Sequence, residues 1–200
     1  MYNKTMKRFV LAITGASGSI LGIRLLEELL KVSEVYLIIS SSAFDIVRTE
    51  TGIDLTSNAQ DILRHRFNTD KLFFYEDRHL WAPVASGSFR TDGMFVVPCT
   101  MKTLSAIANG YANNLIERAA DVTIKERRPL LLCPREMPFS AIHLENMLKL
   151  ARLGVCIAPP VLAFYHQPKS IDEIIDFIVG RILDVMKIEN NLFKRWGEKD

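Results

Sequence analysis

The sequence predicts a single-domain, three-layer α/β sandwich built on a doubly wound, mainly parallel sheet. Short apolar runs alternate with amphipathic helical patterns along all 200 residues. The apolar runs are nearly continuous rather than alternating, which is typical of parallel strands covered on both faces. The chain is 48% hydrophobic and 24% charged, a balance that supports one sizeable core. No internal repeat, low-complexity segment or domain linker interrupts it.

The elements follow in chain order. The predicted strands cover residues 9–13, 35–39, 72–75 (the weakest run), 94–97, 130–133 and 155–158. Helical spacing of apolar residues predicts helices over 20–30, near Asn114, over about 141–152, and from residue 171 onwards. Ser170 is the expected cap of the last helix, and Glu173 would complete a capping box. Residues 83–92, rich in Ser, Gly and Ala, predict a long functional loop.

Composition excludes several classes of protein. A net charge of +2 predicts no nucleic-acid footprint, and no apolar run approaches the roughly 20 residues of a membrane span. The polar extension at residues 1–6 predicts no signal peptide. Cys99, Cys133 and Cys156 lie in apolar surroundings without metal-ligand spacing, which predicts reduced, buried thiols in a cytoplasmic protein. The four histidines are scattered, so no metal site is expected.

The segment after the first strand carries the strongest chemical signal. Thr14-Gly15-Ala16-Ser17-Gly18 joins that strand to a helix, and such a turn can hold a phosphate against the helix start. A short glycine turn can also simply connect the two elements. The ends of the other strands carry Ser40 to Ser42, a Pro-Cys-Thr-Met-Lys-Thr run at 98–103, Pro-Arg-Glu at 134–136, and an aromatic run at 164–166. Together they predict a pocket for a phosphate and a planar ring.

The residues at the end of the second strand indicate which kind of nucleotide could bind. NAD-binding proteins of this class place Asp or Glu at its end to bond the ribose, whereas this chain has serines there. NAD is therefore disfavoured without being excluded. A mononucleotide such as FMN needs only one phosphate site and a slot for its ring.

Seven segments, in order, make the chain recognisable: 14–18 (TGASG), 85–88 (ASGS), 98–103 (PCTMKT), 114–121 (NLIERAAD), 130–136 (LLLCPRE), 143–148 (HLENML) and 164–168 (FYHQP). From about Lys7 to Trp196 the chain resembles the UbiX-type flavin prenyltransferases. These belong to the wider Rossmann-like flavoprotein family that includes flavin-dependent cysteine decarboxylases. Thr100 departs from the serine of many members but keeps the hydroxyl.

The resemblance implies a metal-independent enzyme. It transfers the dimethylallyl group of dimethylallyl phosphate to N5 and C6 of reduced FMN, and the prenylated FMN serves UbiD-type decarboxylases in ubiquinone biosynthesis or aromatic acid decarboxylation. It also implies a homo-oligomer, a dodecamer of packed trimers with sites completed across interfaces. The tail at 187–200 would close the active site or contact a subunit. Preference for the monophosphate or the pyrophosphate donor stays open.

The resemblance also implies roles for particular residues. Glu50 would take the proton from C6 if partial burial raises its pKa, and Trp81 would border the reacting ring. The catalytic residues it implies are Glu50, Lys125, Glu136, Ser17 and Trp81. Those for FMN are Gly15, Ala16, Ser17, Ser40, Ser86, Thr100, Met101, Lys102, Thr103 and Arg135. Those for the prenyl phosphate are Tyr165, Arg181, Arg118, Lys125 and Trp196, beside Glu136.

Other interpretations stay open. Without the resemblance, Arg118, Lys125 and Arg181 are expected on solvated helix faces, and Glu50 at an exposed helix end. An FMN-dependent cysteine-type decarboxylase is the main enzymatic alternative, although residues 19–32 lack the histidine those enzymes are expected to carry. A non-catalytic flavin carrier, or an accessory subunit of an aromatic acid decarboxylase, would tolerate loss of Lys125 and Glu50.

Overall fold

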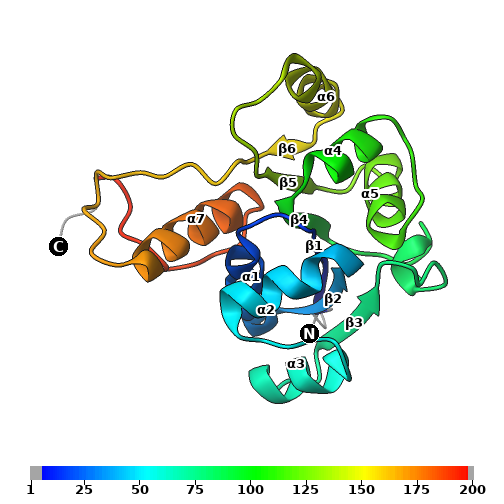
Figure 1. Cartoon of the computed structure of the whole chain (residues 1–200), viewed down its shortest axis with the longest axis horizontal. Helices are drawn as coiled ribbons and strands as arrows, with labels where there is room; N and C mark the ends of the chain where they lie inside the picture. Colours follow the sequence, from blue (N-terminus) through cyan, green and yellow to red (C-terminus); the bar gives the residue numbers. More distant parts are fainter. Residues whose placement is uncertain (1–5, 198–200) are drawn as a thin grey trace, which may run out of the picture.

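The computed structural model describes residues 6–197, and Figure 1 shows them. The strands are β1 Lys7–Ile13, β2 Ser33–Ile39, β3 Leu72–Glu76, β4 Gly93–Cys99, β5 Leu130–Pro134 and β6 Cys156–Ile157. The helices are α1 Ser19–Val32, α2 Phe44–Thr51, α3 Ala59–Phe67, α4 Met101–Ala108, α5 Leu115–Lys125, α6 Ala141–Arg152 and α7 Ile171–Val185. Two short 3-10 turns, η1 Ser41–Ala43 and η2 Pro83–Ala85, complete the elements.

All neighbouring strands of the six-stranded sheet run parallel, in the order β3-β2-β1-β4-β5-β6. The chain winds outwards from β1 in one direction through β2 and β3, and in the other through β4, β5 and β6. The order therefore reverses between β1 and β4, where ligands of doubly wound sheets bind beyond the carboxyl ends of the strands. The predicted fold class is confirmed.

Helices cover both faces of the sheet because each central strand is apolar on both sides. Along β1, Leu11 and Ile13 join one core cluster with α1 and α7, whereas Val10 and Ala12 join a second cluster with α4 and α5. The period of two along a strand assigns alternate residues to opposite faces. This division places α1 and α7 in one layer and α4 and α5 in the other (Figure 1).

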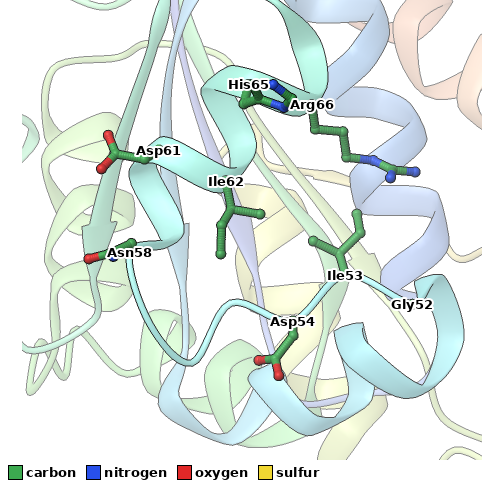
Figure 2. Close-up of a pocket in the computed structure, with 8 residues that line it drawn as sticks. All are labelled: Gly52, Ile53, Asp54, Asn58, Asp61, Ile62, His65 and Arg66. Carbon is green, nitrogen blue, oxygen red and sulfur yellow. The ribbon is translucent and has the colours of Figure 1, made fainter.

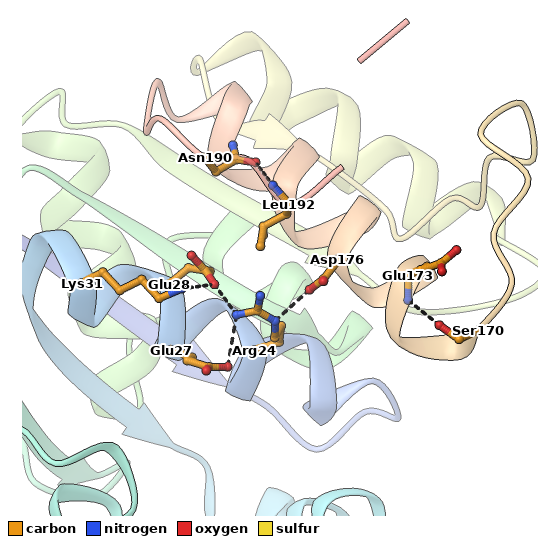
Figure 3. A network of polar contacts seen from close by, with 9 residues as sticks. All are labelled: Arg24, Glu27, Glu28, Lys31, Ser170, Glu173, Asp176, Asn190 and Leu192. Atoms are coloured by element: carbon orange, nitrogen blue, oxygen red, sulfur yellow. Dashed lines mark hydrogen bonds and ion pairs between the residues drawn. The ribbon is translucent and has the colours of Figure 1, made fainter. Parts of the chain in front are cut away.

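Polar contacts also join α1 to α7 (Figure 3). The Arg24 guanidinium on α1 donates from Nε to Asp176 Oδ1 on α7 at 2.8 Å and from Nη1 to Glu27 Oε2 at 3.1 Å. It also bonds Glu28, which accepts from Lys31 Nζ at 2.7 Å. The partly buried pair between Arg24 and Asp176 holds α7 against α1. The candidate donor-binding arginine, Arg181, lies in the C-terminal half of α7.

Some local predictions differ from the structure. The weak run at 72–75 is a full strand, whereas the predicted strand at 155–158 pairs only over Cys156 and Ile157. Ser170 caps α7 by accepting from the Glu173 N–H at 3.2 Å (Figure 3), but the predicted capping box is wrong. The Glu173 carboxylate instead accepts from the Lys169 N–H at 2.7 Å, one residue further out.

Two parts of the chain lie loosely on the sheet. Helix α6 buries only Leu150 fully and Met147 in part, whereas its apolar side chains Ile142, Leu144 and Leu148 are exposed. After β6 the chain runs as an extended arm over 158–170 into the start of α7 (Figure 1). The predicted extension at 1–6 and tail at 187–200 are described only over residue 6 and residues 187–197.

Burial of the cysteines follows the prediction for two of three. Cys99 and Cys133 are buried, but Cys156 is half-buried because it lies on the edge strand β6. Among residues 6–197, no group of three or more His, Cys, Asp or Glu is arranged to hold a metal ion. In the same range, no helix combines the length and apolarity that a membrane crossing requires.

Candidate active site

The loop between β1 and α1 lies at the switch point and is shaped by two glycines. Gly18 adopts φ +100°, a left-handed conformation that glycine adopts at little cost. At Gly15 a Cβ would come within 2.5 Å of Ser42 Oγ, so the loop packs tightly against the end of β2. This contact brings the β1 and β2 loops together, and it requires glycine at position 15.

The donors at the start of α1 hold a carboxylate from the chain itself. Glu50, near the end of α2, accepts from Ser17 Oγ at 2.7 Å and from the Gly18 N–H at 3.0 Å. Its second oxygen accepts from Ser19 Oγ at 2.6 Å and more weakly from the Ile20 N–H at 3.4 Å. The anion that the sequence predicts at this helix start is thus supplied by Glu50.

This arrangement corrects the expected pKa of Glu50. Burial by itself raises the pKa of the carboxyl, but the hydrogen bonds from Ser19, Ser17 and the backbone outweigh it, so that the net pKa is lowered. The expectation of a raised pKa is wrong because the donors around the carboxylate could not be read from the sequence. Glu50 is therefore ionised at neutral pH, and the same donors make its protonation less favourable than that of a free carboxylate.

A second group of hydroxyls lies at the ends of β2 and β4. Ser40 Oγ and Ser42 Oγ are 3.1 Å apart. Thr100 caps α4 by accepting from the Thr103 N–H at 3.2 Å, and its hydroxyl donates to Thr103 Oγ1 at 3.1 Å. Met101 and Lys102 form the first turn of that helix, whose N–H groups face the same edge of the sheet. The candidate FMN residues of β1, β2 and β4 therefore meet at the switch point.

Arg135 follows β5 beside them. Its backbone N–H donates to the Cys99 carbonyl at 3.1 Å, which ties the β5 loop to the end of β4. The next residue, Glu136, is exposed, and its carboxylate accepts from the Met137 N–H at 3.0 Å. Arg135 therefore joins the candidate flavin edge, whereas no contact of Glu136 with a candidate cation is found among residues 6–197.

A separate group forms around the loop before β4. Arg118 on α5 donates to the Ala85 carbonyl at 3.0 Å and pairs with Asp121 at 2.9 Å, which holds the loop with Ser86 against the helix. Lys125 Nζ lies 3.8 Å from Glu126 Oε1 and is half exposed. Trp81, at the start of this loop, is 95% exposed. An indole so exposed is typical of a surface that a ligand or another subunit covers.

The third group lies along α7 and the extended arm that precedes it. The Tyr165 ring on the extended arm meets the Trp196 ring edge-on at 5.1 Å and the Phe177 ring at 5.9 Å. Phe177 and Arg181 line an otherwise apolar cavity of about 300 Å³ between the arm and α7. Phe177 therefore links the Tyr165–Trp196 pair to the cavity that Arg181 lines.

One chain does not bring all the candidate donor residues together. Arg118 and Lys125 belong to the α5 layer, whereas Tyr165 and Arg181 belong with α7 on the opposite face of the sheet. Within residues 6–197 no hydrogen bond or ion pair joins the two sets. In the described part of one chain, the two sets therefore form separate groups.

Sequence reasoning missed three polar residues that shape these groups. Ser19 bonds Glu50, Asp77 accepts from the Ser41 N–H at 3.2 Å, and Asp184 pairs with Arg181 on α7 and Arg195 in the tail. Ser19 adjoins a predicted motif and could have been included. Asp77 and Asp184 are isolated carboxylates in the sequence, which gives no signal of their partners.

A further cavity, of about 590 Å³, opens between the end of α2 and α3 (Figure 2). Its lining includes Ile53, Asp54, Asp61 and Arg66, and none of the predicted site residues. In Figure 2 Ile53 and Ile62 face its middle. It lies away from the switch point and takes no part in the candidate site.

A doubly wound sheet whose switch point gathers hydroxyls, a glycine loop and two helix starts defines a mononucleotide-binding α/β protein. Comparison with known proteins agrees. The family model described as Flavoprotein matches residues 1–183. A flavin prenyltransferase UbiX of Methanocaldococcus jannaschii is 52% identical over 190 residues, covering 95% of this chain and 98% of that protein. The UbiX enzyme of Pseudomonas aeruginosa is 46% identical, covering 96% and 95%.

Two solved structures superpose closely. A UbiX protein in complex with FMN and dimethylallyl pyrophosphate has a TM-score of 0.88 at 44% identity, covering 97% of this chain and 99% of that one. A dodecameric FMN-dependent UbiX-like decarboxylase of Escherichia coli O157:H7 has a TM-score of 0.87 at 43% identity, covering 96% and 100%. The chain belongs to the flavoprotein family and, within it, to the UbiX flavin prenyltransferases.

Proposed function

We propose that this chain transfers a dimethylallyl group from dimethylallyl phosphate to reduced FMN and passes the prenylated product to a UbiD-type decarboxylase. The observation that carries the proposal is the hydroxyl-rich edge at the β1/β4 switch point, in a chain 52% identical to a UbiX flavin prenyltransferase. One relative of 44% identity binds FMN together with dimethylallyl pyrophosphate.

The residues at the switch point fit FMN. Position 15 has no room for a Cβ, and a side chain there would push the loop away from Ser42. Ser40, Ser42 and Thr100 offer hydroxyls for one phosphate, and the start of α4 adds backbone N–H groups. Reduced FMN supplies the nucleophilic ring atoms N5 and C6 when it is bound.

The cations serve the other half of the reaction. Breaking the bond between the allylic carbon and the phosphate oxygen leaves both bonding electrons on the phosphate, whose growing charge needs fixed positive partners. Arg118, Lys125 and Arg181 supply them, and an arginine can contact two phosphate oxygens at once. The π faces of Trp81, Tyr165 and Trp196 suit the allylic cation in a site closed to water.

Glu50 is proposed to take the proton released from C6. Its carboxylate is ionised at neutral pH, as a proton acceptor must be. Ser17 Oγ, 2.7 Å away, is placed to relay that proton or to reorient once the carboxylate is protonated.

A complete donor site is proposed to form between subunits. The α5 cations and the α7 group lie in different layers of one chain, and exposed apolar side chains on α6 and the arm, such as Leu148 and Phe164, are available for subunit contacts. The E. coli relative is dodecameric. We propose the same assembly here, and a solution mass near 22.7 kDa would contradict it. A cytoplasmic location is proposed from the isolated, unpaired cysteines.

The test is anaerobic incubation of the purified protein with reduced FMN and dimethylallyl phosphate, followed by mass measurement of the extracted flavin. A flavin heavier by one C5 prenyl unit supports the proposal, and a parallel reaction with the pyrophosphate identifies the donor. Lys125→Gln should abolish most of the product, while the matched Lys149→Gln, whose ammonium donates to Asn109 Oδ1 at 3.1 Å on the surface, should not. Unmodified FMN with both donors would favour a flavin carrier or thiol decarboxylase instead.

A further inference from the structure

The carboxylate of Asp184, near the end of α7, pairs with two arginines, Arg195 and Arg181, at different distances. Arg195 from the C-terminal tail makes a two-pronged contact, with Nη1 2.6 Å from Oδ2 and Nη2 2.8 Å from Oδ1. Arg181, on α7 itself, reaches the same Oδ2 at 3.3 Å. Asn190 Nδ2 also donates to Oδ1 at 2.9 Å. The carboxylate is therefore fully used, and Arg195 is its principal partner.

The tail reaches this position through a notch in α7. Gly180 has no side chain, and a Cβ there would lie 2.5 Å from Cδ1 of Phe193, so the ring packs directly on the helix backbone. Asn190 donates to the Gly180 carbonyl at 3.2 Å, and the Phe193 ring meets Phe177 at 5.0 Å. These contacts seat the tail so that Arg195 meets Asp184 and the next residue, Trp196, meets Tyr165.

The seating of the tail changes the charge beside the candidate donor site. With the tail in place, Asp184 pairs with both Arg195 and Arg181, and the contacts of Arg195 are the shorter ones. With the tail away, Arg181 and Asp184 remain as an i,i+3 pair on one helix. The Arg181 guanidinium is 56% exposed and the Asp184 side chain only 17%, so the arginine can turn to a ligand while the carboxylate stays.

We propose that Asp184 is a positioning residue that links tail docking to donor binding: Arg195 takes the closer contacts with its carboxylate, which weakens its hold on Arg181 and lets that guanidinium turn to the phosphate of the prenyl donor. The proposal rests on the proposed function, in which Arg181 meets that phosphate. Binding linkage is reciprocal, so the donor must favour the docked tail by the same factor by which the docked tail favours the donor.

The test uses the oligomer loaded with oxidised FMN, because the oxidised ring does not react and binding can be measured alone. Dimethylallyl phosphate is titrated calorimetrically into four proteins: the unmodified chain, Arg195→Gln, Asp184→Asn, and the double variant. Arg195→Gln should weaken binding about two- to fivefold, the range of an exposed ion pair that Arg181 would then form with Asp184. In the double variant, position 184 has no carboxylate to compete with the donor for Arg181. Affinity should therefore return to the unmodified level, although the tail has lost its contact between Arg195 and Asp184.

The affinity of the double variant distinguishes two roles of the Arg195–Asp184 contact: positioning Arg181 for the donor, or only anchoring the tail. If Arg195 only holds the tail, the double variant binds no better than Arg195→Gln, which overturns the proposal and leaves the function intact. If the unmodified protein binds no dimethylallyl phosphate, the function and the proposal fail together. Arg66→Gln on α3 is the matched control, and its affinity should not change. Hydrogen exchange at 190–196 supplies a second readout: the donor should slow it in the unmodified protein, and unchanged exchange would contradict the linkage.

Discussion

The contact of Glu50 with the start of α1 makes a sharp prediction for Glu50→Gln. The glutamine keeps the size of the side chain but replaces one oxygen by an amide nitrogen, which cannot accept. If the amide replaces Oε1, it can no longer accept from Ser17 Oγ at 2.7 Å, and the Gly18 N–H, 3.0 Å from both oxygens, keeps only its contact with Oε2 while it faces the new amide. Hydrogen bonds to a charged group contribute about 1.5–3 kcal/mol each when buried, and partial exposure reduces the pair to about 2 kcal/mol in total.

The assay is thermal unfolding at one fixed protein concentration, because assembly contributes to the stability of an oligomer. For a chain of this length, 2 kcal/mol corresponds to a fall in Tm of about 4–8 °C near pH 7. The folded pKa of Glu50 lies below its ordinary value of 4.5, so its contribution is complete above that value and is lost as pH falls through the lowered pKa. The Tm difference between the two proteins should therefore shrink on acidification.

The matched control is Glu145→Gln on the exposed side of α6, which should change Tm by less than about 1 °C. Two results would refute the reasoning. One is a Glu50→Gln protein as stable as the unmodified chain near neutral pH. The other is a Tm difference that stays constant down to about pH 3, since a loss independent of protonation cannot come from the ionised carboxylate.

Three further predictions test other parts of the structure. Gly22→Ala should destabilise the fold by about 1–3 kcal/mol in chemical denaturation, because its Cβ would lie 2.4 Å from the Val97 carbonyl oxygen; an unchanged midpoint would show that α1 can move away from the sheet. Gly180→Ala should displace Phe193 and speed hydrogen exchange at 190–196, while better helix propensity, about 1 kcal/mol, offsets the lost packing in global stability. Burial raises the pKa of the Cys133 thiol to about 12, so a thiol reagent near pH 8 should label half-buried Cys156 first; rapid labelling of Cys133 would contradict its burial.

The sequence predicted the sheet well because its central strands are nearly continuous apolar runs, buried on both faces. The run 9–13 lies within β1, and the helix at 141–152 matches α6 at both ends. The failures have physical causes. The strand predicted at 155–158 pairs over only two residues because it is an edge strand. The Glu173 carboxylate accepts from the Lys169 N–H, whereas a capping box would need it to accept from the Ser170 N–H.

The candidate site was predictable where its residues adjoin strand ends, and much less so elsewhere. Ser17, Ser40 and Thr100 meet at the switch point because strand order alone brings those loops together. The surroundings of Glu50 depend on how α2 returns to α1, and those of Arg181 on how the tail crosses α7. Both are long-range contacts between polar residues, and no local pattern in the sequence encodes them.

Helix α6 has a consequence for the dissociated chain. It buries one residue fully, Leu150, and joins the rest of the protein mainly through contacts with α4 and β6. Cooperative units with few buried apolar contacts open before the global transition. In an isolated subunit α6 should therefore unfold on its own while the sheet persists, with rapid amide exchange confined to 141–152. Assembly would then finish the folding of this helix, and half-assembled subunits would present it to chaperones and proteases as an unfolded segment.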